Sequence, residues 1–203
     1  MSKTSGLSCG FVGLPNVGKS TLFNALTKQS IPASNYPFCT IDPNVGIVEL
    51  PDSRLQVLSS CSNSAKVIPA SVCFVDIAGL VKGASSGEGL GNKFLSNIRE
   101  TDVIIQVVRC FDDDDVVHVA GSINPIDDIE VITLELILAD IQMGENALQK
   151  MEKQGRTDKS LALGIETLKK ALAYLNENKA LITLEMSDEE RESIKHLPFL
   201  TLK

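Results

Sequence analysis

The apolar residues in the first half of the chain fall in short continuous runs, which are separated by segments that contain glycine and proline. Runs at residues 7–12, 71–76 and 102–108 predict buried strands, and residues 45–50 predict another strand. Runs of this kind are typical of a mostly parallel sheet whose two faces are both covered by helices. Residues 19–28 carry helix formers and follow the first strand after a tight loop. This half of the chain therefore predicts an α/β, three-layer sandwich.

Two connecting segments have compositions that favour loops. Residues 30–44 contain three prolines and show no hydrophobic period, which predicts an extended loop. Five glycines fall between residues 79 and 91, and this much backbone freedom predicts a mobile loop. Both loops are candidates for parts that rearrange when a ligand binds.

The second half of the chain changes to helical spacing. Asp127 or Asp128 is expected to cap a long helix, and a polar break at residues 153–158 separates it from a second helix. In both helices the apolar positions alternate at spacings of three and four, which is a heptad seam. These positions are Leu134, Ile137, Ile141, Leu148 and Met151, then Leu161, Ile165, Leu168, Leu172 and Leu175. Each stripe is too short for an independent coiled coil, so we expect the helices to pack on each other as an antiparallel hairpin.

The last residues predict a return to the sheet. Residues 187–190 have the pattern of a capping box and begin a short helix that Pro198 ends. The apolar residues 199–203 are then expected to begin another strand. The sheet would be unfinished at that point.

The balance of charged residues restricts which molecules the chain can bind. The chain has 26 acidic residues against 19 Lys and Arg, a formal net charge of −7. Binding of nucleic acid over the whole surface of the domain requires clustered Lys and Arg side chains opposite the phosphates. We therefore expect no DNA partner, and any contact with RNA is expected to be local.

The cysteines and the apolar runs indicate the compartment. The five cysteines are widely spaced, and no CxxC pair suggests zinc. They are expected to be mostly buried thiols in a reducing compartment. No apolar run reaches the roughly 18 residues that a membrane span needs, and no signal peptide opens the chain. These observations predict a cytoplasmic protein without a membrane partner.

A phosphate-binding pattern, GxxxxGK(S/T), occurs at residues 13–20 between a predicted strand and a predicted helix. In such a P-loop the backbone N–H groups wrap the phosphates at the positive end of the helix dipole. Lys19 is expected against the β- and γ-phosphate oxygens, and the Ser20 hydroxyl on Mg²⁺. The residues expected to bind the nucleotide here are Asn16, Val17, Gly18, Lys19, Ser20 and Thr21. The alternative is a glycine turn with an ordinary surface lysine.

Three further positions are candidates for contact with the metal and the γ-phosphate. Asp76 ends a buried strand beside the P-loop strand, where the water shell of Mg²⁺ would lie, and Gly79 can offer its N–H to the γ-phosphate. Thr40, in the proline-containing loop, can place its hydroxyl on Mg²⁺ when a triphosphate is bound. The expected metal ligands are thus Ser20, Thr40 and Asp76. A structural turn at Asp76 and an ordinary loop threonine are the alternatives.

These motifs make the expected sandwich a P-loop nucleoside triphosphatase fold of the Ras-like kind. We expect its nucleotide-binding domain to begin with residues 1–130 and the helical hairpin, a coiled coil, to be inserted at 131–185. Residues 186–203 are expected to return to the nucleotide-binding domain.

Four strings in the chain resemble the YchF/Obg-like ATPases, which belong to the TRAFAC class of translation-factor-related P-loop proteins. The strings are GLPNVGKS at 13–20, NYPFCTIDPN at 35–44, DIAGLVKG at 76–83 and VVRCF at 107–111. The resemblance runs from about residue 6 to the last residue, and the strings at 35–44 and 107–111 are its most specific parts. The helical hairpin also fits, since these proteins carry a coiled-coil insertion in the nucleotide domain.

The resemblance implies an ATP-preferring hydrolase that associates with the ribosome, with the large subunit as the expected contact. It also implies that the intact protein continues through a base-reading strand and ends in a TGS domain, so the chain is expected to be an N-terminal fragment. The guanine-reading pattern Asn-Lys-x-Asp does not occur, because the Asn-Lys pairs at residues 92–93 and 178–179 lack the aspartate. A GTP-preferring regulatory GTPase stays open as an alternative.

Residues 76–79 have the pattern DxxG, and the residue after this pattern raises the question of which side chain orients the attacking water. Ras-type enzymes place a glutamine there, but this chain has Leu80, which has no hydrogen-bonding group. The resemblance points to His118 as the catalytic, water-orienting side chain, and the alternative is a loop histidine satisfied by the backbone. Asn16 stands where several relatives hold K⁺ near the phosphates, so K⁺ is a second candidate cofactor beside Mg²⁺.

Three classes of function are compatible with these motifs. The leading one is an ATPase whose hydrolysis resets a ribosome-bound switch. The second is a nucleotide-gated binding protein with negligible hydrolysis, in which the hairpin is an interaction arm. A small-molecule kinase fits poorly, because it would need an arginine-bearing lid and an acceptor pocket, whereas this chain has two switch-like loops.

Overall fold

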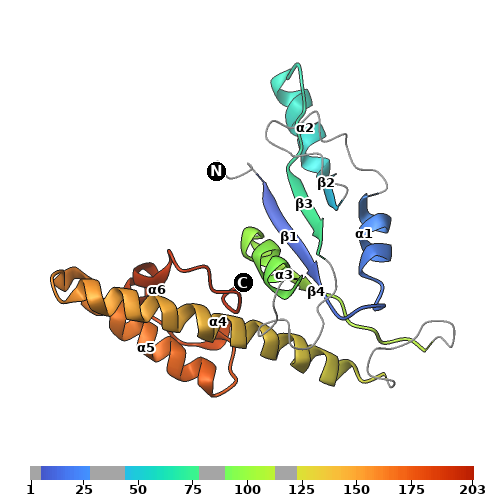
Figure 1. Ribbon diagram of the computed structural model, residues 1–203. Coiled ribbons are helices and arrows are strands. Elements are labelled where there is room, and N and C mark those ends of the chain that lie inside the picture. Colours follow the sequence, from blue (N-terminus) through green and yellow to red (C-terminus); the bar gives the residue numbers. More distant parts are fainter. Residues whose placement is uncertain (1–5, 28–43, 78–89, 113–122) are drawn as a thin grey trace.

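The computed structural model describes residues 6–27, 44–77, 90–112 and 123–203. Figure 1 shows a sheet with helices on both faces, and a long helix beside it that carries a second group of helices. The helices are α1 (Lys19–Thr27), α2 (Ser53–Ser62), α3 (Leu90–Glu100), α4 (Pro125–Gly155), α5 (Ala162–Asn176) and α6 (Asp188–Ile194), with short 3₁₀ helices η2 (Lys159–Leu161) and η3 (Leu181–Thr183). Within these ranges, every helix is too short or too polar to cross a lipid bilayer.

The sheet has four strands in the order β2-β3-β1-β4. They are β1 (Leu7–Val12), β2 (Val45–Glu49), β3 (Ser71–Asp76) and β4 (Val103–Gln106). β1 runs parallel to β3 and to β4, whereas β2 is antiparallel to β3. The predicted mostly parallel sheet is confirmed, and β4 is shorter than the apolar run that predicted it.

Successive residues of β1 face different helices. The ring of Phe11 stacks on that of Phe74 with 5.5 Å between the centroids, and meets Phe23 of α1 edge to face at 6.4 Å. Val12, the next residue, belongs instead to an apolar cluster that contains Ile98 of α3. Because successive side chains of a strand point to opposite faces, α1 and α3 lie on opposite sides of the sheet. The expected three-layer sandwich is therefore confirmed.

Helix α2 lies in a segment for which the sequence predicted no helix. The Asp52 carboxylate caps this helix by accepting a hydrogen bond from the Arg54 N–H at 3.0 Å. None of its residues is buried, and Val57 and Leu58 are exposed. A helix without a buried apolar stripe has no hydrophobic period, which explains why the spacing did not reveal it.

The start of α4 corrects a prediction. The Asn124 side chain accepts a hydrogen bond from the Ile126 N–H at 3.3 Å, and Pro125 begins the helix. The prediction of Asp127 or Asp128 as the cap was therefore wrong. Both aspartates lie in the first turn, where negative charge is favourable at the positive end of the helix dipole.

The structure shows the predicted pair of antiparallel helices, α4 and α5. Gly155 lies against Ile165, and Gly144 lies against Leu172, so residue numbers fall along α4 as they rise along α5. A Cβ atom on Gly144 would come within 2.9 Å of the Leu172 side chain. The glycine therefore lets the two helices approach closely at this level.

The long helix α4 contributes to two apolar cores. Ile132 and Leu136 pack in the cluster on the α3 face of the sheet, whereas Ile137 and Met151 pack in a second cluster with α5 and α6. Leu134 is 42% exposed, so it does not belong to the seam that was predicted to begin there. The first turns of α4 pack on the sheet domain and not on α5, which explains this difference. The division of the chain at residue 131 stays a prediction.

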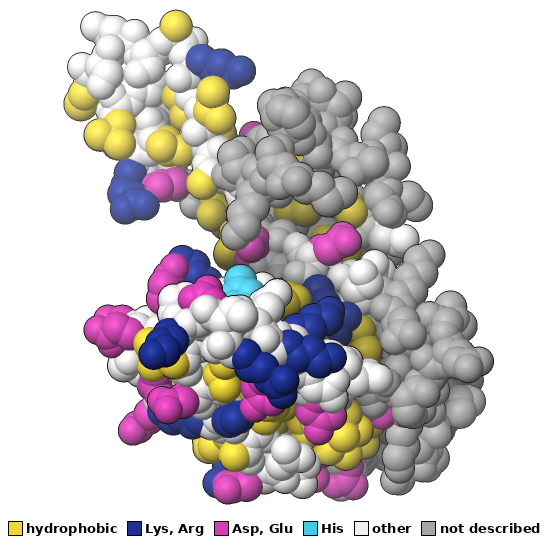
Figure 2. All heavy atoms as spheres, turned by 60° about the vertical axis from the view of Figure 1, so that its left-hand side comes forward, with side chains coloured by type: hydrophobic (Ala, Val, Ile, Leu, Met, Phe, Trp, Pro, Cys, Tyr) yellow, Lys and Arg dark blue, Asp and Glu magenta, His cyan; other side chains and the backbone are white. Residues whose placement is uncertain are grey.

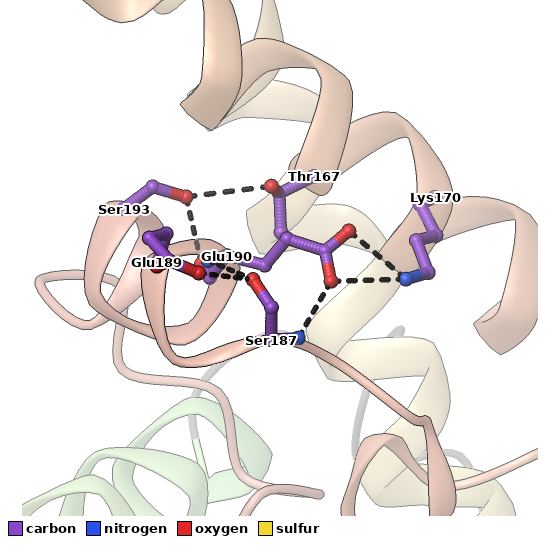
Figure 3. A network of polar contacts seen from close by, with 6 residues as sticks. All are labelled: Thr167, Lys170, Ser187, Glu189, Glu190 and Ser193. Carbon is purple, nitrogen blue, oxygen red and sulfur yellow. Dashed lines mark hydrogen bonds and ion pairs between the residues drawn. The ribbon is translucent and has the colours of Figure 1, made fainter.

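The predicted capping box at the start of α6 is confirmed (Figure 3). The Ser187 N–H donates to the Glu190 carboxylate at 2.8 Å, and the Glu190 N–H donates to the Ser187 hydroxyl at 3.2 Å. Lys170 of α5 also donates to the Glu190 carboxylate at 2.9 Å, and this hydrogen bond is the main reason why the Glu190 pKa is lowered. The hydroxyl of Ser193 donates to that of Thr167 at 3.4 Å. These contacts attach α6 to α5.

Residues 199–203 form a turn and not the expected strand. The Asp140 carboxylate of α4 accepts hydrogen bonds from the Leu200 N–H, the Thr201 N–H and the Thr201 hydroxyl, each at 2.8 Å. Asp140 is fully buried, and burial raises its pKa although these hydrogen bonds and Arg99 act in the opposite direction. The two backbone N–H groups that a strand would use in a ladder are thus bound to a buried carboxylate, so the apolar run does not form a strand.

Lys203 joins this turn to the end of α3. Its ammonium donates to the carbonyl oxygens of Ile98 at 2.8 Å and Arg99 at 2.9 Å, and also to that of Thr101. Carbonyl groups at the end of a helix lack intrahelical partners, and positive charge is favourable there. Burial lowers the pKa of Lys203, and nearby carboxylates act in the opposite direction.

The cysteines depart from the expectation of mostly buried thiols. Cys9 is buried and Cys73 is partly buried, but Cys61 and Cys110 are exposed. Burial raises the pKa of the Cys9 thiol. Cys39 lies outside the described residues.

Replacing Asp140 with alanine should destabilise the fold by about 3 kcal/mol, because it leaves buried N–H groups and a buried hydroxyl without their acceptor. Urea unfolding followed by circular dichroism measures this change. Glu145→Ala, at an exposed position of the same helix, is the control and should change the free energy of unfolding by less than about 0.5 kcal/mol. An Asp140→Ala protein as stable as the Glu145→Ala control would contradict the structural role of the carboxylate.

Candidate functional site: a P-loop with a serine–aspartate pair

The segment between β1 and α1 turns around backbone positions that favour glycine. Gly18 has a φ of 97° and Asn16 a φ of 62°, both in the left-handed region that glycine and asparagine adopt most easily. A Cβ atom on Gly13 would lie 2.4 Å from the carbonyl oxygen of Val107, in the segment that follows β4. The backbone itself therefore requires glycine at both ends of the pattern, for close approach at Gly13 and for its φ at Gly18.

Lys19 is buried within this loop. Its side chain is 7% exposed, and its ammonium donates to the carbonyl oxygens of Gly13 at 3.0 Å and Leu14 at 2.7 Å. Burial lowers the Lys19 pKa, and the charge of Asp76 acts in the opposite direction. The geometry is not that of an ordinary surface lysine, because lysine is rarely buried unless it is paired.

Ser20 and Asp76 meet across the site. In the parallel pairing of β1 with β3, Asp76 lies opposite Phe11. The carboxylate therefore lies at the C-terminal ends of these strands, where the P-loop begins. The Ser20 hydroxyl donates to Asp76 Oδ2 at 2.6 Å. The other carboxylate oxygen, Oδ1, is buried and has no hydrogen-bond partner among the described residues.

This pair fits a Mg²⁺ ion that is shared with a nucleotide. Among the described His, Cys, Asp and Glu residues, no three come together as a metal cage. Mg²⁺ does not need such a cage, because it is usually held by one or two protein oxygens together with water and phosphate oxygens. The buried Asp76 Oδ1 is an acceptor that the metal or one of its waters would satisfy.

The start of α1 positions the remaining P-loop residues. Val17 is 3% exposed and its side chain packs in the α3-face cluster, so it can serve a phosphate only through its backbone N–H. Asn16 and Thr21 are exposed. Because the first N–H groups of a helix have no intrahelical partner, the start of α1 offers a set of donors to an anion.

Comparison with known families agrees with this geometry. A sequence profile of the family described as "50S ribosome-binding GTPase" matches residues 8–186. The chain belongs to this family. The matched range includes the P-loop, Asp76 and both helices of the hairpin.

Individual members of the family are also similar to the chain. The ribosome-binding ATPase YchF of Haemophilus ducreyi is 55% identical over 199 residues, which cover 98% of this chain and 55% of that protein. The protein of the same name from Bacillus subtilis is 52% identical over 198 residues, 97% of this chain and 54% of that protein. The chain thus spans about half the length of the curated relatives it matches.

A solved structure agrees as well. The structure of the Schizosaccharomyces pombe YchF GTPase superposes with a TM-score of 0.78 at 40% identity, and covers all of this chain and 56% of that chain. The predicted resemblance to the YchF/Obg-like ATPases is therefore confirmed.

The described residues hold part of the predicted family site. Ser20 contacts Asp76, and Lys19 lies near enough to Asp76 for its pKa to respond to that charge. The other positions of interest, Thr40, Gly79, Leu80 and His118, lie outside the described residues.

Arg109 is a buried cation two residues after Val107, whose carbonyl oxygen lies against Gly13. Its side chain is 1% exposed, its Nε donates to the Phe111 carbonyl oxygen at 3.1 Å, and its guanidinium lies 4.8 Å from the centre of the Phe111 ring. The Val107 N–H nearby donates to the Val12 carbonyl oxygen at 2.7 Å. These Arg109 contacts both lie within residues 109–111, in the segment that follows the Val107 carbonyl oxygen at Gly13. The sequence signal that could have pointed to Arg109 is a single cationic residue at the end of an apolar run.

Replacing Ser20 with alanine should lower the affinity for ATP in Mg²⁺ about tenfold and change the affinity in EDTA little, because the hydroxyl is expected to meet the metal. Isothermal titration with and without Mg²⁺ makes the comparison. The control is Ser60→Ala, which removes an exposed hydroxyl that bonds only within α2, to the Gln56 carbonyl oxygen. An equal loss in Mg²⁺ and in EDTA would assign Ser20 to the phosphates and contradict its role at the metal.

Proposed function

We propose that the protein binds ATP with Mg²⁺ at residues 13–20, hydrolyses it to the diphosphate and phosphate, and acts as a ribosome-associated switch. One observation carries this proposal: a buried lysine lies inside the P-loop beside the 2.6 Å contact between Ser20 and Asp76. The reaction and the partner are those in the names of the relatives, which are ribosome-binding ATPases.

The contacts of the Lys19 ammonium within the loop support its role in binding the nucleotide. Its ammonium now donates to two carbonyl oxygens of the loop, and phosphate oxygens would replace them as charged acceptors. The N–H groups at the start of α1 would hold the same phosphates. Mg²⁺, when bound, neutralises charge on the β- and γ-phosphate oxygens. Ser20 and Thr40 would hold it directly, and Asp76 would hold its water shell.

Hydrolysis needs a group that orients water, and Leu80 offers none. We assign this task to His118, on the basis of the family resemblance. Gly79 would donate its N–H to the γ-phosphate, and the loop that contains Thr40 would close over the same phosphate. Release of both contacts after hydrolysis would reset the switch.

The choice of base rests on the relatives. Those from Haemophilus and Bacillus are named ATPases, whereas the Schizosaccharomyces structure is described as that of a GTPase. The two ATPases are 55% and 52% identical to this chain, and the GTPase is 40% identical. We therefore propose ATP as the preferred nucleotide, with a GTP-preferring enzyme as the alternative.

We also propose the large ribosomal subunit as the partner, the cytoplasm as the location and K⁺ as a second ion. The description of the family as binding the 50S particle supports contact with the large ribosomal subunit. Such a partner would place the protein in the cytoplasm. Asn16, which has a left-handed backbone in the P-loop, is the proposed ligand for a K⁺ ion near the phosphates.

Turnover of ATP and of GTP, measured with and without isolated large or small ribosomal subunits, tests the proposed function. The expected result is ATP turnover that exceeds GTP turnover and that responds to the large subunit. No turnover under any condition, with nucleotide still bound, would favour a nucleotide-gated binding protein instead.

His118→Ala should lower kcat for ATP about tenfold or more while the Kd for ATP stays nearly unchanged, because the side chain is assigned to water and not to the nucleotide. Single-turnover hydrolysis and ATP titration measure the two quantities on the same preparation. Unchanged turnover would remove His118 from the mechanism.

Hydrolysis should be faster in KCl than in NaCl at the same ionic strength, because K⁺ held by Asn16 would add positive charge beside the phosphates. Asn16→Ala should abolish the difference between the two salts. Equal rates of the wild-type protein in both salts would leave no case for K⁺.

A further inference from the structure

The turn at residues 199–203 joins the two apolar cores of the molecule. Leu200 is fully buried in the cluster on the α3 face of the sheet, whereas Phe199 and Leu202 pack in the cluster of α4, α5 and α6. Val17 of the P-loop belongs to the same cluster as Leu200. One set of packed side chains therefore extends from the proposed phosphate-binding loop to this turn.

Polar contacts attach the turn to three neighbouring elements. The Leu200 and Thr201 N–H groups donate to the buried Asp140 carboxylate of α4. The Lys203 ammonium donates to carbonyl oxygens at the end of α3. The Ile182 N–H of η3 donates to the Thr201 carbonyl oxygen at 2.9 Å. A movement of any of these elements would therefore change the contacts of the turn.

The two charged groups in these contacts are sensitive to the loss of a partner. Burial acts against the charge of Asp140 by raising its pKa, and against the charge of Lys203 by lowering its pKa. Charges removed from water are stable only while their partners stay in place. Figure 2 shows, by contrast, acidic and basic side chains interspersed on the exposed face of the helical part of the molecule, where water can replace a lost partner. The contacts of Asp140 and Lys203 should therefore form and break as one unit.

Helix α3 gives this unit a second connection to the nucleotide site. β3 ends at Asp76, and α3 is the next described helix along the chain. Its residues Phe94 and Ile98 pack in the same cluster as Val17. Because Lys203 binds the last carbonyl groups of α3, a displacement of this helix would act directly on the Lys203 contacts.

We propose that the turn at residues 199–203, held by Asp140 and Lys203, is a latch that couples the nucleotide site to the helical part formed by α4, α5 and α6. The closed form is the arrangement in the structure, and in the open form the turn leaves both partners. A nucleotide that binds one form better shifts the balance between the forms, and by linkage the latch changes the affinity for that nucleotide by the same factor. The proposal rests on the proposed function, because it needs a nucleotide at residues 13–20.

Two measurements on the full-length protein give this factor independently. Hydrogen exchange of the peptide that contains Leu200 and Thr201 reports how often the latch opens, in Mg²⁺ with either ADP or a non-hydrolysable ATP analogue. Isothermal titration gives the ratio of the Kd values for the same two nucleotides. The wild-type exchange rates should differ about fivefold or more between the nucleotides. Lys203→Met should change the ratio of the Kd values by the same factor, because without the ammonium the latch stays open.

The matched control is Lys169→Met. It makes the same change at an exposed lysine that pairs with Glu152 across α4 and α5 at 2.7 Å, and should leave both the exchange of the turn and the ratio of the Kd values as in the wild-type protein. Thr201→Val removes one of the three hydrogen bonds to Asp140, so it should change the ratio in the same direction as Lys203→Met but less. Circular dichroism checks the folding of each variant, and Thr201→Val alone gives the test if Lys203→Met does not fold.

An unchanged ratio of the Kd values in Lys203→Met and Thr201→Val would overturn the proposal, because a merely structural role alters the affinity for both nucleotides alike. Equal wild-type exchange with both nucleotides would overturn it too. In either case the proposed function stands if the wild-type protein still binds and hydrolyses ATP, so the latch alone fails. A wild-type protein that binds neither nucleotide would contradict the proposed function itself, and the latch would fail with it.

Discussion

The parallel pairing of β1 with β3 is the constraint on which the site depends. This pairing places Asp76 opposite Phe11, so the carboxylate at the end of one strand reaches the loop that begins at the end of its neighbour. The contact of Ser20 with Asp76 at 2.6 Å follows from that register. A shift of one residue would turn Asp76 to the other face of the sheet, because side chains alternate along a strand. The geometry that suits Mg²⁺ and phosphate is therefore a property of the sheet and not of the P-loop alone.

The helical part of the molecule is attached to the same framework by a second polar contact. The Asp140 carboxylate of α4 holds the turn at residues 199–203, and Lys203 in that turn holds the last carbonyl groups of α3. α3 is the next described helix after β3, and it packs on the sheet beside Val12. α4 is thus connected to the sheet in two ways. One is through α3, and the other is the direct packing of Ile132 in the same cluster.

The parts that could be predicted from the sequence are those with local causes. The P-loop, the strand that ends at Asp76 and the capping box at Ser187 depend on residue types within a few positions of one another. The turn at residues 199–203 could not be predicted, because its cause is a buried carboxylate some 60 positions away in the chain. α2 was missed because it buries no side chain, and the cap of α4 was misplaced because Asn124 lies before a proline, outside the apolar period that was followed.

A crystal structure of the protein with a non-hydrolysable ATP analogue and Mn²⁺ in place of Mg²⁺ tests the central claim most directly, because the anomalous signal locates the metal. The account predicts one Mn²⁺ ion with the Ser20 hydroxyl oxygen and phosphate oxygens in its coordination shell, Asp76 facing its water shell, and Lys19 turned from the loop carbonyl groups to the phosphates. A nucleotide bound elsewhere, or a metal that contacts neither Ser20 nor the water held by Asp76, would contradict it.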